Sequence, residues 1–245
     1  MKQEVLTIVG NRPLTDSMME LRLSGDVGAV TVPGQFVNLK LDGFYLRRPI
    51  SVCDCRPEEL TLLYKVVGQG TRALRERKPG ETLDVLLGLG NGYDLSVSGD
   101  APLLLGGGAG VPPMYWLCRE LIAEGRSCTV ILGFNTASEI FYEQEFRDLG
   151  AKVIITTADG SRGIQGFVTN PMTDLSYSHF YVCGPEPMLR AVYRASTTSG
   201  QFSFEERMGC GFGACMGCSC KTVTGYKRIC RDGPVLRKEE ILWDR

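Results

Sequence analysis

The chain contains very little histidine: His179 is the only one among 245 residues. A single imidazole excludes the histidine-rich metal centres and leaves at most one histidine for general acid–base chemistry. Because an isolated histidine is most often a packed or surface residue, we expect His179 to be structural.

The sequence also lacks an excess of one charge and a long hydrophobic run. Lys and Arg total 27 against 28 Asp and Glu, so no overall field favours nucleic acid or an anionic membrane. No apolar stretch approaches the ~18 residues of a membrane span. The polar N-terminus, residues 1–7, has no apolar signal-peptide core. We therefore expect a cytoplasmic protein without a membrane or nucleic-acid partner.

Cysteine, by contrast, is abundant, with ten residues. In a reducing cytosol, clustered cysteines more often hold metal or do redox work than form disulfides. Five of the ten fall between Cys210 and Cys230, whereas the cysteines of a disulfide framework would be spread along the chain. Four others are predicted to be small core residues: Cys53, Cys55, Cys118 and Cys128.

The periodicity of hydrophobic residues divides the chain into three parts. Residues 1–99 show about six short strands at ~10–15-residue spacing, which predicts a small antiparallel β-barrel. In residues 100–203, apolar strands alternate with helical segments, which is typical of parallel βαβ units. Residues 204–245 form a Cys- and Gly-rich module. The predicted fold class is therefore β + α/β, with a barrel, a parallel-sheet nucleotide-binding domain and a small C-terminal module.

A glycine-rich turn, residues 106–113, follows a buried apolar strand and precedes a helix. Glycine at such a turn lets a pyrophosphate approach the backbone, and the helix start offers free N–H groups. Pro113 stands where a third glycine is usual, but proline is compatible with the first helical turn. A plain strand–helix turn is the alternative, and the strand–glycine–helix context favours a nucleotide.

The segment after the second strand of this unit bears on the choice of nucleotide. No Arg or Lys lies between Phe134 and Phe146, whereas Glu139, Glu143 and Glu145 do. A 2′-phosphate normally requires a cation near that strand end. We therefore expect NAD(H) rather than NADP(H), although no acid lies at the strand tip itself.

The strongest signal is the spacing of the C-terminal cysteines. Cys210, Cys215 and Cys218 form Cys-x4-Cys-x2-Cys, and Cys230 follows after eleven residues, the plant-type spacing of a 2Fe–2S cluster. The small residues between them let one loop wrap an inorganic core and turn its N–H groups toward sulfur. Structural zinc is the main alternative, although it more often shows two separated Cys-x2-Cys knuckles, and inert thiols are another. Cys220 is predicted to be a packed thiol.

Four segments together resemble the ferredoxin–NADP reductase superfamily. They combine a flavin motif, a second FAD-phosphate turn, a nicotinamide-nucleotide turn and a Cys-Gly-Pro-x-x-Met segment. They lie at residues 48–51, 68–71, 106–113 and 183–188.

Within that superfamily, residues 205–218 and 226–235 are similar to one branch, the electron-transfer subunit of class 1B dihydroorotate dehydrogenase. The resemblance covers nearly the whole chain. It implies three cofactors, namely FAD, a 2Fe–2S cluster and NAD, with the cluster held by Cys210, Cys215, Cys218 and Cys230.

The resemblance also implies which residues bind the nucleotides. A guanidinium would pair with the FAD pyrophosphate, the next three residues would border the isoalloxazine, and a short strand would line its ribityl and adenine side. A glycine–threonine turn would hold phosphate through backbone N–H groups and the hydroxyl. For Tyr64 and Lys65 an exposed strand face is the alternative. The implied FAD residues are Arg48, Pro49, Ile50, Ser51, Leu63, Tyr64, Lys65, Gly70 and Thr71, and Gly107, Gly108, Gly110 and Cys183 would frame the nicotinamide nucleotide.

The implied activity is electron transfer in pyrimidine biosynthesis. An FMN-containing catalytic partner subunit, with two copies of each chain, would oxidise dihydroorotate, and electrons would pass through 2Fe–2S and FAD to NAD⁺. No side chain would act as a catalytic nucleophile or acid–base pair. The enzymatic alternative is the flavin subunit of a bifurcating NADH–ferredoxin:NADP oxidoreductase or a sulfide dehydrogenase, which typically has Asp at the position of Cys210. The non-enzymatic alternative is a zinc-stapled nucleotide sensor.

The C-terminal segment 221–245 carries seven Lys or Arg and four acids. Near the cluster, such a local excess would steer an acidic partner face. A solvated basic tail is the alternative.

Overall fold

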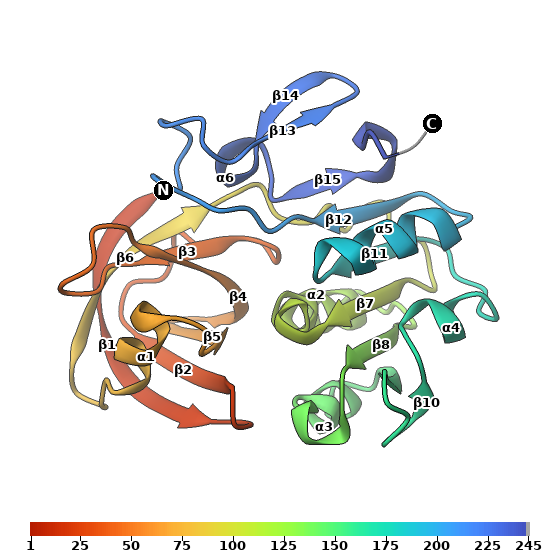
Figure 1. Cartoon of the computed structure of the whole chain (residues 1–245), viewed down its shortest axis with the longest axis horizontal. Helices are drawn as coiled ribbons and strands as arrows, with labels where there is room; N and C mark the ends of the chain where they lie inside the picture. Colours follow the sequence, from red (N-terminus) through yellow and green to blue (C-terminus); the bar gives the residue numbers. More distant parts are fainter. Residues whose placement is uncertain (244–245) are drawn as a thin grey trace.

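The computed structural model of the chain describes residues 1–243 (Figure 1). Six strands close into an antiparallel barrel in the order β1-β2-β5-β4-β3-β6. Along β6 every second residue is buried, as expected of a strand with one face in a barrel core. The strands are β1 Lys2–Pro13, β2 Met18–Ser24, β3 Phe36–Leu39, β4 Arg48–Arg56, β5 Glu59–Lys65 and β6 Thr82–Leu89, and helix α1 is Gln69–Arg75.

The second unit is a seven-stranded sheet in the order β10-β9-β8-β7-β11-β12-β15. All residues of β7 and β11 are buried, because helices cover both faces of a parallel sheet. Its strands are β7 Leu103–Gly107, β8 Thr129–Phe134, β9 Lys152–Thr157, β10 Ile164–Gln165, β11 Phe180–Cys183, β12 Gly200–Ser203 and β15 Val235–Arg237. Its helices are η1 Gly108–Gly110, α2 Pro112–Ala123, η2 Ala137–Glu139, α3 Glu143–Asp148, α4 Thr169–Met172 and α5 Glu186–Ala195.

The C-terminal segment folds over one edge of this sheet and over the barrel (Figure 1). It contains a hairpin of β13 Ser219–Thr222 and β14 Gly225–Arg228, then α6 Ile229–Asp232 and η3 Lys238–Glu240. Strand β15 leaves the module and pairs antiparallel with β12. The segment is therefore continuous with the sheet. The predicted fold class is confirmed. None of the helices in residues 1–243 has the length and apolar character that crossing a membrane requires.

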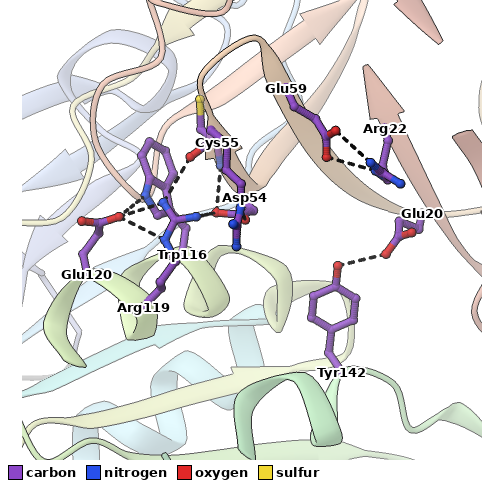
Figure 2. Close-up of polar contacts among 10 residues, drawn as sticks. Glu20, Arg22, Asp54, Cys55, Glu59, Trp116, Arg119, Glu120 and Tyr142 are labelled. Atoms are coloured by element: carbon purple, nitrogen blue, oxygen red, sulfur yellow. Dashed lines mark hydrogen bonds and ion pairs between the residues drawn. The ribbon is translucent and has the colours of Figure 1, made fainter. Parts of the chain in front are cut away.

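Fixed polar contacts join the barrel to the nucleotide-binding unit, where α2 packs against β4 (Figure 2). The Arg119 guanidinium on α2 pairs with the Asp54 carboxylate and donates to the Cys55 carbonyl at 3.1 Å. Tyr142, which precedes α3, donates its hydroxyl to the buried Glu20 carboxylate on β2 at 3.0 Å. These contacts fix the barrel against the sheet.

Candidate redox site

A cavity of about 500 Å³ opens at the carboxyl ends of β7, β8 and β9. The glycine turn forms one wall. Gly108 has φ +51, and a side chain built there would meet nothing within 4 Å, so its backbone faces open space. A side chain at Gly110 would instead overlap the Cys183 carbonyl. The turn thus uses glycine for two reasons: Gly110 allows close packing, and Gly108 leaves room for a ligand.

Three of the four residues predicted to frame the nicotinamide nucleotide line this cavity: Gly107, Gly108 and Gly110. Cys183 does not line it. Its side chain is 1% exposed, and burial raises the pKa of its thiol. The structure places the Cys183 thiol in the core and its carbonyl beneath Gly110, so any part in framing the nucleotide is through the backbone.

Glu139, an acid of the segment after β8, lines this cavity, although the sequence analysis did not place it at the strand tip. After β8 the chain turns through η2, and the Glu139 carboxylate returns to the strand tip. Its Oε2 accepts hydrogen bonds from the Asn135 backbone N–H at 3.3 Å and the Asn135 amide at 2.9 Å. Glu139 does not adjoin the strand in the sequence, but its carboxylate lies at the strand tip in the structure. The expectation that no acid lies there is therefore wrong. The 3₁₀ turn η2, Ala137–Glu139, is too short to show a period in the sequence, and it brings the carboxylate back to Asn135.

On the barrel, the predicted flavin motif occupies the start of β4, where Arg48, Pro49, Ile50 and Ser51 are all partly exposed. The Arg48 guanidinium lies 4.8 Å from the centroid of the Phe44 ring. A side chain at Gly70, near the start of α1, would overlap that guanidinium. A cation beside the free N–H groups of a helix start fits the pyrophosphate that FAD would bring.

The Thr71 hydroxyl is used within its own turn. It accepts hydrogen bonds from the N–H groups of Val67 at 3.0 Å and Gly68 at 3.1 Å, and it donates to the Gly68 carbonyl at 3.2 Å. These bonds fix the conformation of the turn that leads into α1. The predicted phosphate contact through this hydroxyl has no support in the structure, and the contact through backbone N–H groups is still a prediction.

The end of β5 limits another prediction, because any contact of Leu63 or Tyr64 with FAD would be through the backbone. Tyr64 is 2% exposed, its hydroxyl donates to Asn11 at 3.0 Å, and burial raises its pKa to about 12. Leu63 is 4% exposed and lies in a hydrophobic core. Neither side chain has a surface open to a flavin, because both are buried in the protein's own core. Lys65 alone is exposed, and it lines the nucleotide cavity.

The cysteine loop lies against the neighbouring barrel strand, β3. The Asn38 amide donates to the Cys210 carbonyl at 3.3 Å, and a side chain at Gly211 would overlap that amide. Asn38 stands directly opposite Pro49 of the flavin motif in the β3–β4 ladder. Strand β3 therefore connects the two predicted sites, since its backbone lies roughly 5 Å from β4 and its Asn38 side chain reaches the cysteine loop.

Backbone N–H groups of the loop point at sulfur. Cys210 Sγ accepts from Ala214 at 3.2 Å and Cys215 at 3.4 Å, and Cys218 Sγ accepts from Cys230 at 3.4 Å. Burial opposes ionisation of Cys210, but backbone donors outweigh it and lower its pKa to about 6. Positive φ values at Gly211, Gly213 and Met216 turn the loop so that these donors converge.

The four cysteines form two pairs rather than one four-membered cage. Cys210 contacts Cys215, and Cys218 contacts Cys230. No group of three or more His, Cys, Asp or Glu in the described part of the chain is arranged around a single ion. Two pairs fit a binuclear cluster, in which each iron takes two protein thiolates, better than tetrahedral zinc, which requires all four together.

Two further cysteine and histidine expectations agree with the geometry. Cys220 lies in β13, half-buried and outside both pairs, and burial raises its pKa. His179 is 6% exposed, packs edge-on against Tyr181, and lies 3.3 Å from the Gln201 amide. Burial lowers the pKa of His179. Neither residue lines the nucleotide cavity.

The basic C-terminal segment is largely paired within the protein. Lys227 contacts Glu240, Arg228 contacts Asp232 at 3.3 Å, and Arg237 contacts Asp94 at 3.1 Å. These pairs weaken the hypothesis that the segment steers an acidic partner. Arg245, the last of its seven basic residues, lies outside the described residues.

The matches to known families fall within the C-terminal cysteine module and the nucleotide-binding unit. Residues 205–242 match the family model of the iron–sulfur cluster binding domain of dihydroorotate dehydrogenase B, and residues 104–194 match the oxidoreductase NAD-binding domain. The dihydroorotate dehydrogenase B (NAD(+)) electron transfer subunit of Geobacillus sp. (strain WCH70) is 44% identical over 256 residues, covering 99% of each chain. That of Bacillus pumilus (strain SAFR-032) is 43% identical over 255 residues, covering 98% of each.

Solved structures agree on the fold. A chain of the NADH-dependent reduced ferredoxin–NADP oxidoreductase superposes with a TM-score of 0.88 at 28% identity, covering 98% of this chain and 90% of that one. A ferredoxin NADP⁺ reductase from Neisseria gonorrhoeae with bound FAD and NADP gives a TM-score of 0.69 at 15% identity, covering 80% and 90%. The second likeness concerns the fold alone.

Proposed function

Because the chain belongs to the family of dihydroorotate dehydrogenase B electron transfer subunits, we propose that it carries electrons from a dihydroorotate-oxidising partner to NAD⁺. The partner is an FMN-containing catalytic subunit of pyrimidine biosynthesis, and two copies of each chain assemble. Residues 1–99 serve FAD, residues 100–203 serve NAD, and residues 204–245 serve the 2Fe–2S cluster.

The order of three barrel strands carries this proposal. Strand β4, with the flavin motif, lies between β3 and β5. Asn38 of β3 holds the cysteine loop, and Lys65 of β5 lines the nucleotide cavity. A flavin on β4 would thus lie between the source of single electrons and the acceptor of hydride.

The protein's own residues bind and orient rather than react. Arg48 would hold the pyrophosphate of FAD, Gly108 would open the backbone to the dinucleotide, and the N–H groups around Cys210 would stabilise thiolate. When bound, FAD supplies the conversion between single electrons and hydride. No acid–base side chain is needed, in keeping with the core position of His179.

The partner docks, in this proposal, over the cysteine loop. Two large apolar side chains of that loop are exposed, Phe212 at 44% and Met216 at 53%. Apolar side chains around a redox centre are typical of a surface that a partner covers.

The decisive test is turnover by the native complex. We expect dihydroorotate-dependent reduction of NAD⁺, with one NADH formed per orotate, and two irons and two acid-labile sulfides per chain. The second candidate is a bifurcating oxidoreductase, favoured by the TM-score of 0.88 to such an enzyme's chain. A complex that reduces ferredoxin with NADPH and ignores dihydroorotate would establish that candidate and overturn the first.

A further inference from the structure

The nucleotide cavity extends well beyond the glycine turn, and its direction identifies the half of a dinucleotide that each end receives. The strand order reverses between β7 and β11, and in such sheets the pyrophosphate lies on the glycine turn at this point. The nicotinamide half must reach the flavin strand β4. The adenosine half therefore extends the other way, over the carboxyl ends of β8 and β9.

The cavity follows that path. Beyond the glycine turn it is lined by Gly133, Phe134 and Asn135 after β8, and by Thr156 and Ala158 at the end of β9. Glu139 lines the same end. The Thr156 hydroxyl is buried and has no hydrogen-bond partner among the protein atoms described. A polar ligand is thus expected at this end, since a buried hydroxyl without a partner is unfavourable.

The Glu139 carboxylate is held in place with one oxygen free. Both bonds from Asn135 go to Oε2, and no donor within residues 1–243 reaches Oε1. The bonds to Oε2 fix the orientation of the carboxylate, so Oε1 is available to accept a hydrogen bond from a ligand hydroxyl.

The same end of the cavity has no cation among residues 1–243. The only basic residue of that part of the chain that lines the cavity is Lys65, which comes from the barrel. Arg162, which follows β9, has its guanidinium paired with Glu143 at 2.8 Å. A 2′-phosphate placed here would meet a carboxylate and find no positive partner.

We propose that Glu139 accepts a hydrogen bond from the 2′-hydroxyl of the adenosine ribose and repels a 2′-phosphate, so that it selects NAD(H) over NADP(H). This inference rests on the proposed function for the presence of a nicotinamide dinucleotide. It assigns the preference for NAD(H) over NADP(H) to a single side chain of this protein.

The test separates nucleotide recognition from turnover by titrating the purified complex with 5′-AMP and 2′,5′-ADP. These probes carry only the adenosine half and differ by the 2′-phosphate. Glu139→Gln is nearly isosteric and still accepts the bonds from Asn135. Glu124→Gln, on an exposed residue at the end of α2, is the matched control. Calorimetry measures both affinities without dihydroorotate.

Wild-type complex should bind 5′-AMP more tightly than 2′,5′-ADP. In Glu139→Gln we expect this ratio to fall by about tenfold, which corresponds to about 1.4 kcal/mol. The ratio of kcat/KM for NAD⁺ to that for NADP⁺ should fall in parallel, mainly through KM for NADP⁺. Glu124→Gln should match wild type in both ratios.

Three outcomes would overturn the inference: a probe ratio in Glu139→Gln within twofold of wild type, a wild-type preference for 2′,5′-ADP, or no binding of either probe. A complex that binds the probes as expected but does not oxidise dihydroorotate would instead count against the proposed function and leave the role of Glu139 intact.

Discussion

Replacing Tyr142 by phenylalanine should destabilise the protein by removing one buried hydrogen bond between its two large units (Figure 2). The Tyr142 hydroxyl donates to the Glu20 carboxylate at 3.0 Å, and the two residues are 8% and 6% exposed. A hydrogen bond to a buried charged group contributes about 1.5–3 kcal/mol. For a chain of this length, each kcal/mol lowers Tm by roughly 2–4 °C. The expected loss is therefore roughly 3–12 °C.

Thermal unfolding of the purified complex, followed by calorimetry, measures this effect. Tyr45→Phe is the matched control, because it removes the same atom from a side chain that is 100% exposed. We expect Tyr45→Phe to leave Tm unchanged. If Tyr142→Phe and Tyr45→Phe unfold within 1 °C of each other, the buried bond does not stabilise the contact between barrel and sheet, and the reasoning fails.

Three other changes test the cofactor sites and the core. Gly70→Ala should displace the overlapping Arg48 guanidinium and weaken FAD binding roughly tenfold, whereas Gly68→Ala, which meets nothing within 4 Å, should retain FAD when flavin fluorescence is titrated. Cys215→Ser should lower iron and sulfide content and the visible absorption, and unchanged absorption would exclude Cys215 as a ligand. Because burial lowers the folded-state pKa of His179, its contribution to stability is present above pH ~6.5 and is lost as pH falls below that value. His179→Gln should therefore show a smaller loss of Tm between pH 7.5 and 5.5 than wild type, and equal losses would contradict this.

The spacing of hydrophobic residues was sufficient to predict the barrel and the parallel sheet, because the period of each local segment determines which faces are buried when the elements pack together. The family resemblance, drawn from short motifs and the cysteine spacing, is confirmed by relatives aligned over 99% of the chain. Strand β15 is different. It has three residues, too few to show a period, and only its pairing with β12 defines it.

The two differences from expectation at the candidate site have opposite physical causes. Neighbouring residues of a strand point to opposite faces, so Tyr64 and Lys65 cannot both face one cofactor. A sequence-motif match assigns a role to each of several consecutive residues, and it does not distinguish which face of the strand each side chain occupies. The position of Glu139 was not predicted for the converse reason, since η2 returns its carboxylate to a strand tip that the residue does not adjoin in sequence.

The contacts between barrel and sheet also bear on how electrons could move through the chain. Asp54, which pairs with Arg119, lies three residues beyond Ser51 on β4. Glu20 on β2 accepts a hydrogen bond from the Tyr142 hydroxyl. The same strand that carries the flavin motif is thus fixed to the helix that follows the glycine turn. With Asn38 holding the cysteine loop from the other side, both predicted neighbours of the flavin have set positions. Transfer in such a frame requires no hinge between the two large units, and in the proposed complex the partner would dock over the exposed Phe212 and Met216.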